Sequence, residues 1–235
     1  MTEQYGWHFL PDNGRLSHGD GRKAEVGVML TVEPPLKLCD HGLHWCRRAI
    51  DALHNGIGAL ACYVRAGGET LERADQCCST ERTVIAMADA TALLHEFACW
   101  CAEGALRTAG ITDRRSWAAI ETKRRWLRGE ATDAELYAAR NAAGFSAGDV
   151  AWAAVGATAR TAASEAAQAA ARVAAWDAAG VAAWDAAGVA AWDAAGVAAW
   201  DAARAAARIA QSVELEQRLR ALLVLGDAEG PEVTP

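Results

Sequence analysis

Residues Ala174 to Ala203 read AAWDAAGVAAWDAAGVAAWDAAGVAAWDAA, which is three copies of the octapeptide Ala-Ala-Trp-Asp-Ala-Ala-Gly-Val and the start of a fourth. Alanine loses no side-chain entropy in a helix, and the stretch contains no proline. We therefore expect helix here and over most of residues 146–225. Each glycine costs about 1 kcal/mol relative to alanine in a helix. We accordingly expect either one long helix bent at Gly180, Gly188 and Gly196, or two to three shorter helices folded on one another.

The tryptophans of this repeat recur every eight residues, at Trp176, Trp184, Trp192 and Trp200. Eight residues advance about 800° around a helix, so each indole lies about 80° beyond the last. Because these side chains are the main apolar bulk of the segment, most of them should face a neighbour and not water. Each is followed by aspartate, so a partner-binding ladder is one interpretation. Duplication of a short coding unit, with little selection on helix length, is the simpler one.

Composition and charge limit the classes of function. The 235 residues include 23 Lys or Arg against 30 Asp or Glu, a net charge of −7. Residues 146–235 hold 6 basic and 11 acidic side chains, which argues against nucleic-acid binding there, because phosphate recognition needs clustered cations. Seven cysteines without an N-terminal apolar signal segment predict a cytoplasmic protein with free thiols. No stretch is typical of a membrane-spanning helix, and an aspartate every eight residues is costly in hydrocarbon.

Residues 1–90 are predicted to form a small α+β domain with a mixed sheet. Short β-prone runs predict strands at 6–10, 26–32, 59–66 and 81–87. The first strand ends at the turn Pro11-Asp12-Asn13-Gly14, and Pro34-Pro35 ends the second. Apolar spacing predicts a short helix from Cys46 to His54, ended by Asn55-Gly56.

Residues 91–225 are predicted to be helical, and 226–235 to be a flexible tail. Apolar spacing predicts one helix over 91–108 and a second from Thr112 or Asp113 to Arg128. Thr132 and Glu135 match a capping box that begins a third. Short helices joined by tight turns favour an antiparallel bundle. The predicted fold class is therefore α+β, a mixed-sheet domain followed by an all-α, Ala-rich bundle.

The eight residues from Cys39 to Cys46 carry the densest group of metal-ligand side chains, namely Cys39, His41, His44 and Cys46. Thiolates and imidazoles are the ligands that zinc prefers. Zinc modules, however, use two well-separated ligand pairs, so a packed turn whose histidines bond to the backbone is the alternative. A nucleophile and base pair is a third interpretation, but no orienting group or oxyanion element accompanies it.

Two resemblances follow from these residues. Gly42-Leu43-His44-Trp45-Cys46, Asp51-Ala52-Leu53 and Tyr63-Val64-Arg65-Ala66-Gly67 stand in the order of an uncharacterised domain found in phage and bacterial proteins. That domain is marked by Gly, then Leu or Phe, then His-x-Cys, followed by a short helix and a strand that ends in Gly. The resemblance covers residues 6 to about 88 and implies a fold but no activity. The same Gly-aliphatic-His turn is also similar to ADP-ribosyltransferase folds.

The second resemblance covers about residues 95–225. Cys101-Ala102-Glu103, Asp113-Arg114-Arg115-Ser116 and the run from Arg125 to Thr132 resemble predicted immunity proteins of bacterial toxin systems, which are all-helical and Ala-rich at their C-termini. Such a protein occludes a toxin through a complementary surface. The candidate partner-binding residues are the basic cluster Lys123, Arg124, Arg125 and Arg128, which could bind an acidic toxin or nucleic acid, and, separately, the four repeat tryptophans. A solvated helix face with arginine stems on Trp126 is the alternative.

Taken together, the sequence favours a non-enzymatic protein that binds another macromolecule, a toxin-like protein, through its helical half. This interpretation includes no catalytic residue and no cofactor. The alternative is a nucleotide- or zinc-binding, enzyme-like N-terminal domain centred on Cys39 to Cys46.

Overall fold

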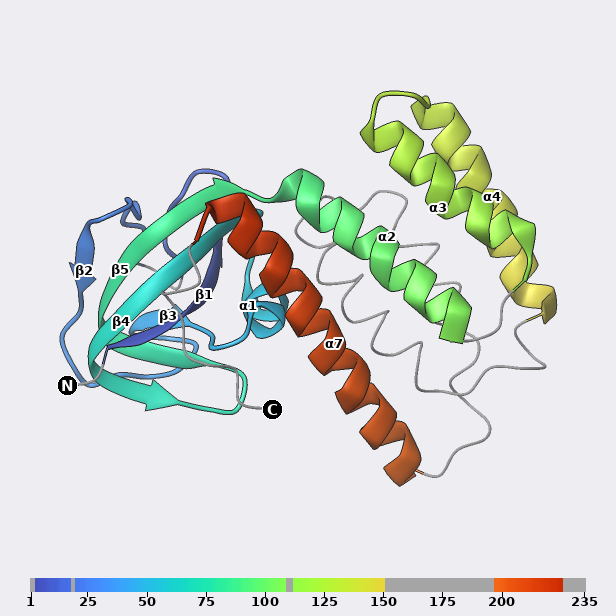
Figure 1. Ribbon diagram of the computed structural model, residues 1–235. Helices are drawn as coiled ribbons and strands as arrows, with labels where there is room; N and C mark the ends of the chain where they lie inside the picture. Colours follow the sequence, from blue (N-terminus) through green and yellow to red (C-terminus); the bar gives the residue numbers. More distant parts are fainter. Residues whose placement is uncertain (1–2, 18–19, 109–111, 151–196, 226–235) are drawn as a thin grey trace. The chain divides into compact units, whose positions relative to one another are not determined.

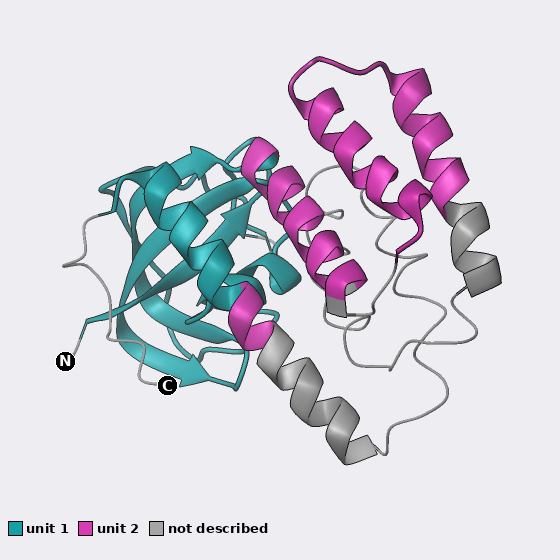
Figure 2. Cartoon of the chain, turned by 45° about the vertical axis from the view of Figure 1, so that its right-hand side comes forward, with its two compact units in different colours: residues 1–91, 212–235 teal, residues 92–211 magenta. Residues whose placement is uncertain are grey.

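The computed structural model describes residues 3–17, 20–108, 112–150 and 197–225 (Figure 1). The chain divides into two compact units (Figure 2). Unit 1 comprises residues 1–91 and 212–235, and unit 2 comprises residues 92–211. The described part of the chain thus combines an antiparallel sheet with several helices, which confirms the α+β class.

Unit 1 is built on an antiparallel five-stranded sheet, which corrects the mixed sheet predicted for residues 1–90, because every strand pair is antiparallel. Its strands are β1 (Gln4–Leu10), β2 (Met29–Thr31), β3 (Leu43–Trp45), β4 (Leu60–Glu72) and β5 (Cys77–Asp89). The order is β1-β4-β5-β2, and β3 also pairs with β5. The hairpin of β4 and β5 is the longest part of the sheet, and Figure 1 shows it as a strongly curved ribbon.

A backbone connection joins β3 back to β1. Cys46, which directly follows β3, exchanges two backbone hydrogen bonds with Trp7, at 2.7 and 2.8 Å. The strands β1, β4, β5 and β3 therefore form a closed circuit of backbone hydrogen bonds. Gly6 permits this approach, because a Cβ atom there would lie 2.4 Å from the Cys46 carbonyl oxygen and 2.5 Å from the Trp45 ring.

One face of the sheet carries the main core of unit 1. Side chains two residues apart on a strand share a face, and Cys62, Val64 and Ala66 of β4 pack there with Val84 of β5. The loops before β3 cover this face. The buried members of the cluster are Leu10, Leu16, Ala24, Leu43, Trp45, Cys62, Val64, Ala66, Cys77 and Val84.

The C-terminal helix completes unit 1. Helix α7 (Val197–Leu223) belongs to unit 1 from Ser212 onward. Its Leu215 and Leu219 are fully buried, one helical turn apart. The prediction that residues 91–225 form a single helical domain is therefore corrected, because these leucines place the end of the chain with the sheet.

A hydrogen bond ties α7 to helix α1 (Ala49–Asn55). The N-cap residue of α1, Arg48, makes no side-chain capping bond. Instead, the Ala49 amide donates to Glu216 Oε1 of α7 at 3.0 Å. Glu216 thereby satisfies one of the amide groups that a helix N-terminus leaves unpaired. The guanidinium of Arg220 lies 5.4 Å from the centre of the Tyr63 ring on β4.

Unit 2 contains α2 (Thr91–Thr108), α3 (Arg114–Leu127) and α4 (Asp133–Val150). The bounds of α2 match the prediction. Asp113 caps α3 by accepting from the Arg115 amide at 2.8 Å. The predicted capping box before α4 is confirmed, since the Thr132 amide donates to Glu135 Oε2 and the Glu135 amide donates to Thr132 Oγ1. A core cluster of unit 2 consists of Cys99, Ala102, Leu106 and Ile120, with Trp117 packed against it.

Other expectations differ in their bounds. The strand predicted at 26–32 is only three residues long, and β3 was not predicted. The strand expected to end at Gly67-Gly68 continues to Glu72, because a register shift between Gly67 and Thr70 absorbs the glycines. Most of the octapeptide repeat lies outside the described residues, whereas its end, from Val197, is the start of α7. Within the described residues, no helix is long and apolar enough to cross a membrane.

Candidate functional site

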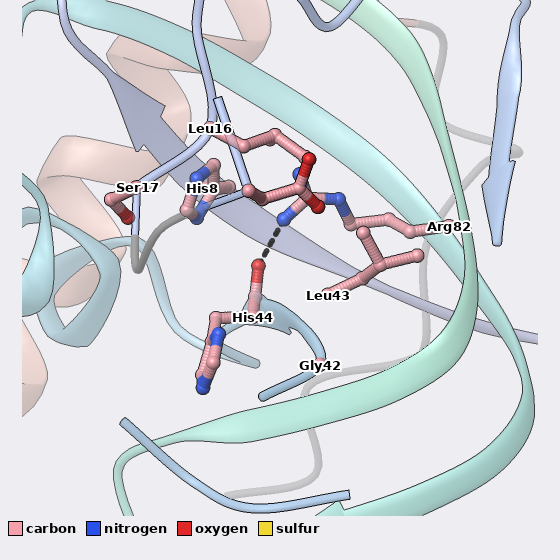
Figure 3. Close-up of a pocket in the computed structure, with 8 residues that line it drawn as sticks. His8, Leu16, Ser17, Gly42, Leu43, His44 and Arg82 are labelled. Carbon is pink, nitrogen blue, oxygen red and sulfur yellow. Dashed lines mark hydrogen bonds between the residues drawn. The ribbon is translucent and has the colours of Figure 1, made fainter. Parts of the chain in front are cut away.

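A small hollow opens on the core face of the unit 1 sheet (Figure 3). It encloses about 220 Å³ of empty space, part of which is open to solvent. Residues from β1, β3, β5 and the loop after β1 surround it. They are His8, Leu16, Ser17, Asp20, Gly42, Leu43, His44 and Arg82.

Arg82 is the central cation of this hollow. It lies on β5 two residues before Val84, so its side chain points to the core face, and it is only 2% exposed. Its Nη1 donates to the backbone carbonyl of His44, the bond drawn in Figure 3. Its Nε and Nη2 groups are buried and donate to no described residue. Burial lowers the pKa of Arg82 to about 10, which still leaves the guanidinium charged at neutral pH.

The turn before β3 fixes the opposite wall. Gly42 has a φ of 135°, and a Cβ atom at this position would lie 3.0 Å from the Cys78 side chain. Glycine at this position therefore lets the turn approach β5 closely. His44 follows in β3, opposite Cys78, and its Nε2 accepts a hydrogen bond from the Cys39 amide at 2.9 Å. This hydrogen bond holds the His44 imidazole against the turn that contains Cys39.

The only carboxylate among the described residues around the hollow is Asp20, and it is bound to Arg22. Arg22 Nε and Nη2 donate to the two carboxylate oxygens of Asp20 at 2.7 and 2.8 Å. This hydrogen bonding is the main reason that the pKa of Asp20 is lowered. Since the Asp20 charge is matched by Arg22, the Arg82 charge is the excess charge of the hollow.

A second hollow adjoins the first, and His8, Ser17 and His44 line both. About 350 Å³ of empty space, part of it open to solvent, lies between β1, β3 and the end of α1. Its wall mixes apolar and polar side chains, and no Asp, Glu, Lys or Arg is among its described lining residues. The remaining lining residues are Phe9, Trp45, Cys46, Ala52, Asn55, Gly56, Ile57 and Gln76.

The four predicted zinc ligands do not come together as one group. Cys39 is exposed and its thiol lies 3.1 Å from Gln76 Oε1. His41 Nε2 lies 2.7 Å from the Glu33 carbonyl oxygen. Cys46 is buried, and burial raises the pKa of its thiol to about 12. Within the described residues, no three His, Cys, Asp or Glu side chains form a group that could hold a metal ion. The hydrogen bonds of the His41 and His44 rings to backbone atoms agree with the alternative prediction, a packed turn.

The predicted partner-binding cations of α3 are engaged within unit 2. Lys123 is 2% exposed, and its Nζ lies 3.9 Å from the centre of the Trp126 ring, so it adds nothing to an exposed basic face. Arg124 bonds to Glu103 and also to Glu96, at 3.2 Å.

The other two arginines of this set are half-exposed and paired. Arg125 donates to the Glu130 carbonyl oxygen at 2.9 Å, and Arg128 binds the Glu130 carboxylate at 2.8 Å.

Of the four repeat tryptophans, Trp176, Trp184 and Trp192 lie outside the described residues. Trp200 falls within α7, but its side chain is not described.

Sequence reasoning did not identify Arg82, His8 or Ser17 as site residues. The available signal was an arginine two residues before the apolar run that begins at Val84, on the same parity as Val84. No family model, no curated protein and no solved structure matches this chain. The two resemblances stated from the sequence therefore remain predictions, and the function must be argued from the geometry.

Proposed function

We propose that unit 1 is a binding domain for a small anionic group, a phosphate or a carboxylate, held on Arg82. The observation that supports this is a fully buried guanidinium with two donor groups that bond to no described residue. This proposal belongs to the ligand-binding alternative for the N-terminal domain, although it rests on a different set of residues from the predicted zinc ligands.

The chemistry of the unpaired donors suits an anion. Nε and Nη2 lie along one edge of the guanidinium, and their N–H groups point the same way. Such an edge donates two parallel hydrogen bonds to two oxygens of one carboxylate or phosphate. Burying an unpaired charge and unpaired donors is costly. A bound anion would neutralise the charge and satisfy both donors at once.

The surroundings of Arg82 add polar groups and one carboxylate, Asp20, which is already bound to Arg22. Figure 3 shows His8 and Ser17 on one side of the Arg82 guanidinium and His44 on another. The hydroxyl of Ser17 is a donor that an anion can accept from. Arg22 binds both oxygens of Asp20, so Asp20 acts on the Arg82 guanidinium as a nearby negative charge and leaves its Nε and Nη2 donors unpaired.

Calorimetric titration of the full chain with inorganic phosphate, and separately with acetate, tests this proposal. We expect saturable binding of at least one of them, weakened at least tenfold by Arg82→Gln, because the neutral amide lacks both the charge and the two-donor edge. Arg65→Gln is the matched control, since Arg65 is a partly exposed arginine on β4 whose ion pair is with Glu3. Arg65→Gln should bind like wild type.

Two results would overturn the proposal. One is the absence of binding of either anion to the wild-type chain. The other is equal affinity of wild type and Arg82→Gln. Arg82→Lys keeps a positive charge but not the two-donor edge, so intermediate affinity is expected, and this variant serves if Arg82→Gln does not fold.

Binding of another macromolecule through the helical half is a second candidate function. It is supported by Tyr137 on α4, an aromatic side chain that is 64% exposed, since tyrosine is enriched at protein interfaces. The candidate keeps the prediction that the Ala-rich tract belongs to a helical bundle and that the partner is a toxin-like protein.

The unit boundaries sharpen the test of this second candidate. A deletion should remove residues 92–211 and retain 212–225, because Leu215 and Leu219 belong to unit 1. We expect a partner recovered with the full chain to be lost on this deletion and weakened by Tyr137→Ala. Retention of the partner by the deletion variant would contradict it.

A further inference from the structure

We propose that unit 1 binds a second copy of this chain through the exposed face of α7, with the two helices antiparallel. This inference goes beyond the proposed function, because it concerns the outer surface of unit 1 and not the hollow around Arg82. It does not depend on whether an anion binds there.

The part of α7 that belongs to unit 1 has two different faces. Leu215 and Leu219 are fully buried, whereas Val213, Gln217 and Ala221 are exposed. Residues four apart lie on one side of a helix, so these three form a single exposed stripe. We call Val213, Gln217 and Ala221 the outer face of α7. Figure 2 shows this part of the helix alongside the sheet of unit 1.

The side chains of the outer face suit contact with a copy of themselves. Val213 is 45% exposed, and Ala221 is small enough to let another helix approach closely. A two-fold interface uses the same surface on both copies. If Gln217 lies on the two-fold axis, each amide can donate to the other, because an amide is both donor and acceptor. Val213 of one copy then lies level with Ala221 of the other.

Charged residues flank the outer face in an order that favours an antiparallel pair. At about 100° per residue, Glu214 and Arg218 lie on one flank, and Glu216 and Arg220 lie on the other. In an antiparallel pair each flank meets its own copy, so Glu214 faces Arg218. In a parallel pair the two different flanks meet, so Glu214 would face Glu216 and Arg218 would face Arg220. Like charges repel, so the order of charges selects the antiparallel pair.

The first flank is available for contacts with another copy. Arg218 Nε and Nη2 bind the same oxygen of Glu214, Oε1, at 2.7 and 2.6 Å. The side chains of Arg218 and Glu214 are 31% and 26% exposed, so Glu214 Oε2 can accept from Arg218 of the second copy. On the other flank, Glu216 already accepts from the Ala49 amide and the Ser212 hydroxyl. The pair of Glu214 and Arg218 is therefore the one to test.

Sedimentation velocity of the full chain, at about 5 to 500 µM, tests the proposal. One helix face is smaller than a standard interface, so we expect a weak, reversible dimer in this range. Val213→Glu should weaken the dimer about tenfold, because it places a charge in the contact. Val28→Glu is the matched control, since Val28 is a valine of unit 1 that is 46% exposed, and it should leave the dimer unchanged.

Charge exchange tests the antiparallel arrangement. Glu214→Arg and Arg218→Glu should each weaken the dimer about tenfold, because like charges then meet at two symmetry-related places. An equimolar mixture of the two variants should form a heterodimer with an affinity near that of the wild-type dimer, because each arginine again faces a glutamate. Both residues are partly exposed, and circular dichroism of each variant alone checks that it folds.

Four results would overturn the proposal. The first is a chain that stays monomeric at every concentration, and the second is a dimer that Val213→Glu leaves unchanged. The third is a mixture of the two charge variants that associates no better than either alone. The fourth is a tighter dimer of Glu214→Arg, which would indicate a parallel pair. None of these results bears on anion binding at Arg82, so each leaves the proposed function standing.

Discussion

Arg82 in unit 1 and Arg124 in unit 2 are both cations within packed surroundings, but their partners differ. Arg124 binds the carboxylates of Glu96 and Glu103, and this hydrogen bonding raises its pKa. Arg82 hydrogen-bonds to the carbonyl oxygen of His44 and, among the described residues, to no carboxylate, and burial lowers its pKa. The helical unit thus satisfies this cation internally, whereas the sheet unit leaves one that suits an external anion.

The two units also differ in how their chains come together. Unit 2 includes consecutive helices whose caps link near neighbours in sequence, and Arg124 reaches Glu96, 28 residues away, on a neighbouring element of the same unit. Unit 1 joins residues 1–91 to the end of the chain, and Glu216 caps a helix that begins at Ala49. Contacts between such distant segments are the ones that sequence patterns do not reveal.

Leu219→Ala should have the largest effect on stability. Leu219 is fully buried in unit 1, so truncation should cost about 2–5 kcal/mol of unfolding free energy. Leu222→Ala, at a partly exposed leucine of the same helix, is the control and should cost less than about 1 kcal/mol. Amide hydrogen exchange should locate the loss in β1, β4 and β5. Equal costs for the two variants would contradict the placement of this helix in unit 1.

Replacing each of the two arginines with methionine should give unequal results. Arg124→Met leaves two carboxylates without their cation and should cost about 1–3 kcal/mol. Arg82→Met removes a buried charge with two unpaired donors, so stability should change by less than about 1 kcal/mol or rise. Urea unfolding measures both. A larger loss for Arg82→Met would show that Arg82 is satisfied within the protein.

Thr132→Ala should have a moderate effect within unit 2. It removes both hydrogen bonds of the Thr132 hydroxyl with Glu135 and keeps the one from the residue 132 amide, so it should cost about 1 kcal/mol. Circular dichroism during urea unfolding would record the change. No measurable loss of unfolding free energy would indicate that the N-terminal end of α4 frays in the wild-type chain.

The smallest effect should be the pH dependence contributed by Glu216. Burial raises the pKa of Glu216, so the folded chain holds this proton more tightly than the unfolded chain does. Stability should therefore fall as pH rises from the unfolded value of about 4.3 through the raised folded pKa. Glu216→Gln keeps an oxygen acceptor for Ala49 and should flatten this part of the stability profile. An unchanged slope would mean that the carboxyl is well hydrated.

Local signals predicted the helical unit well. The bounds of α2, the Asp113 cap and the capping box at Thr132 each depend on residues within one or two turns. The strands were predicted less well, because their lengths depend on partners. The strand predicted to end at Gly67-Gly68 continues as β4, since Gly68 takes a φ of 71° and the Glu69 amide donates to Thr80 Oγ1.

The site could be predicted only in part. His44 was selected from the sequence for its neighbouring cysteines and not for its place beside Arg82. His8, Ser17 and Arg82 are far apart in sequence and meet only because β1, β3 and β5 are joined through β4 and the Cys46 connection. Nothing in the spacing of these residues encodes that order of strands.

The most direct measurement is the arginine Nε–H region of a ¹H–¹⁵N NMR spectrum during a phosphate titration. The Arg82 signal is assigned by its absence in Arg82→Gln, and the Arg124 signal by its absence in Arg124→Met. We predict that the Arg82 signal moves with the affinity measured by calorimetry, while the Arg124 signal stays in place. An Arg82 signal that is unchanged at saturating phosphate would contradict the account.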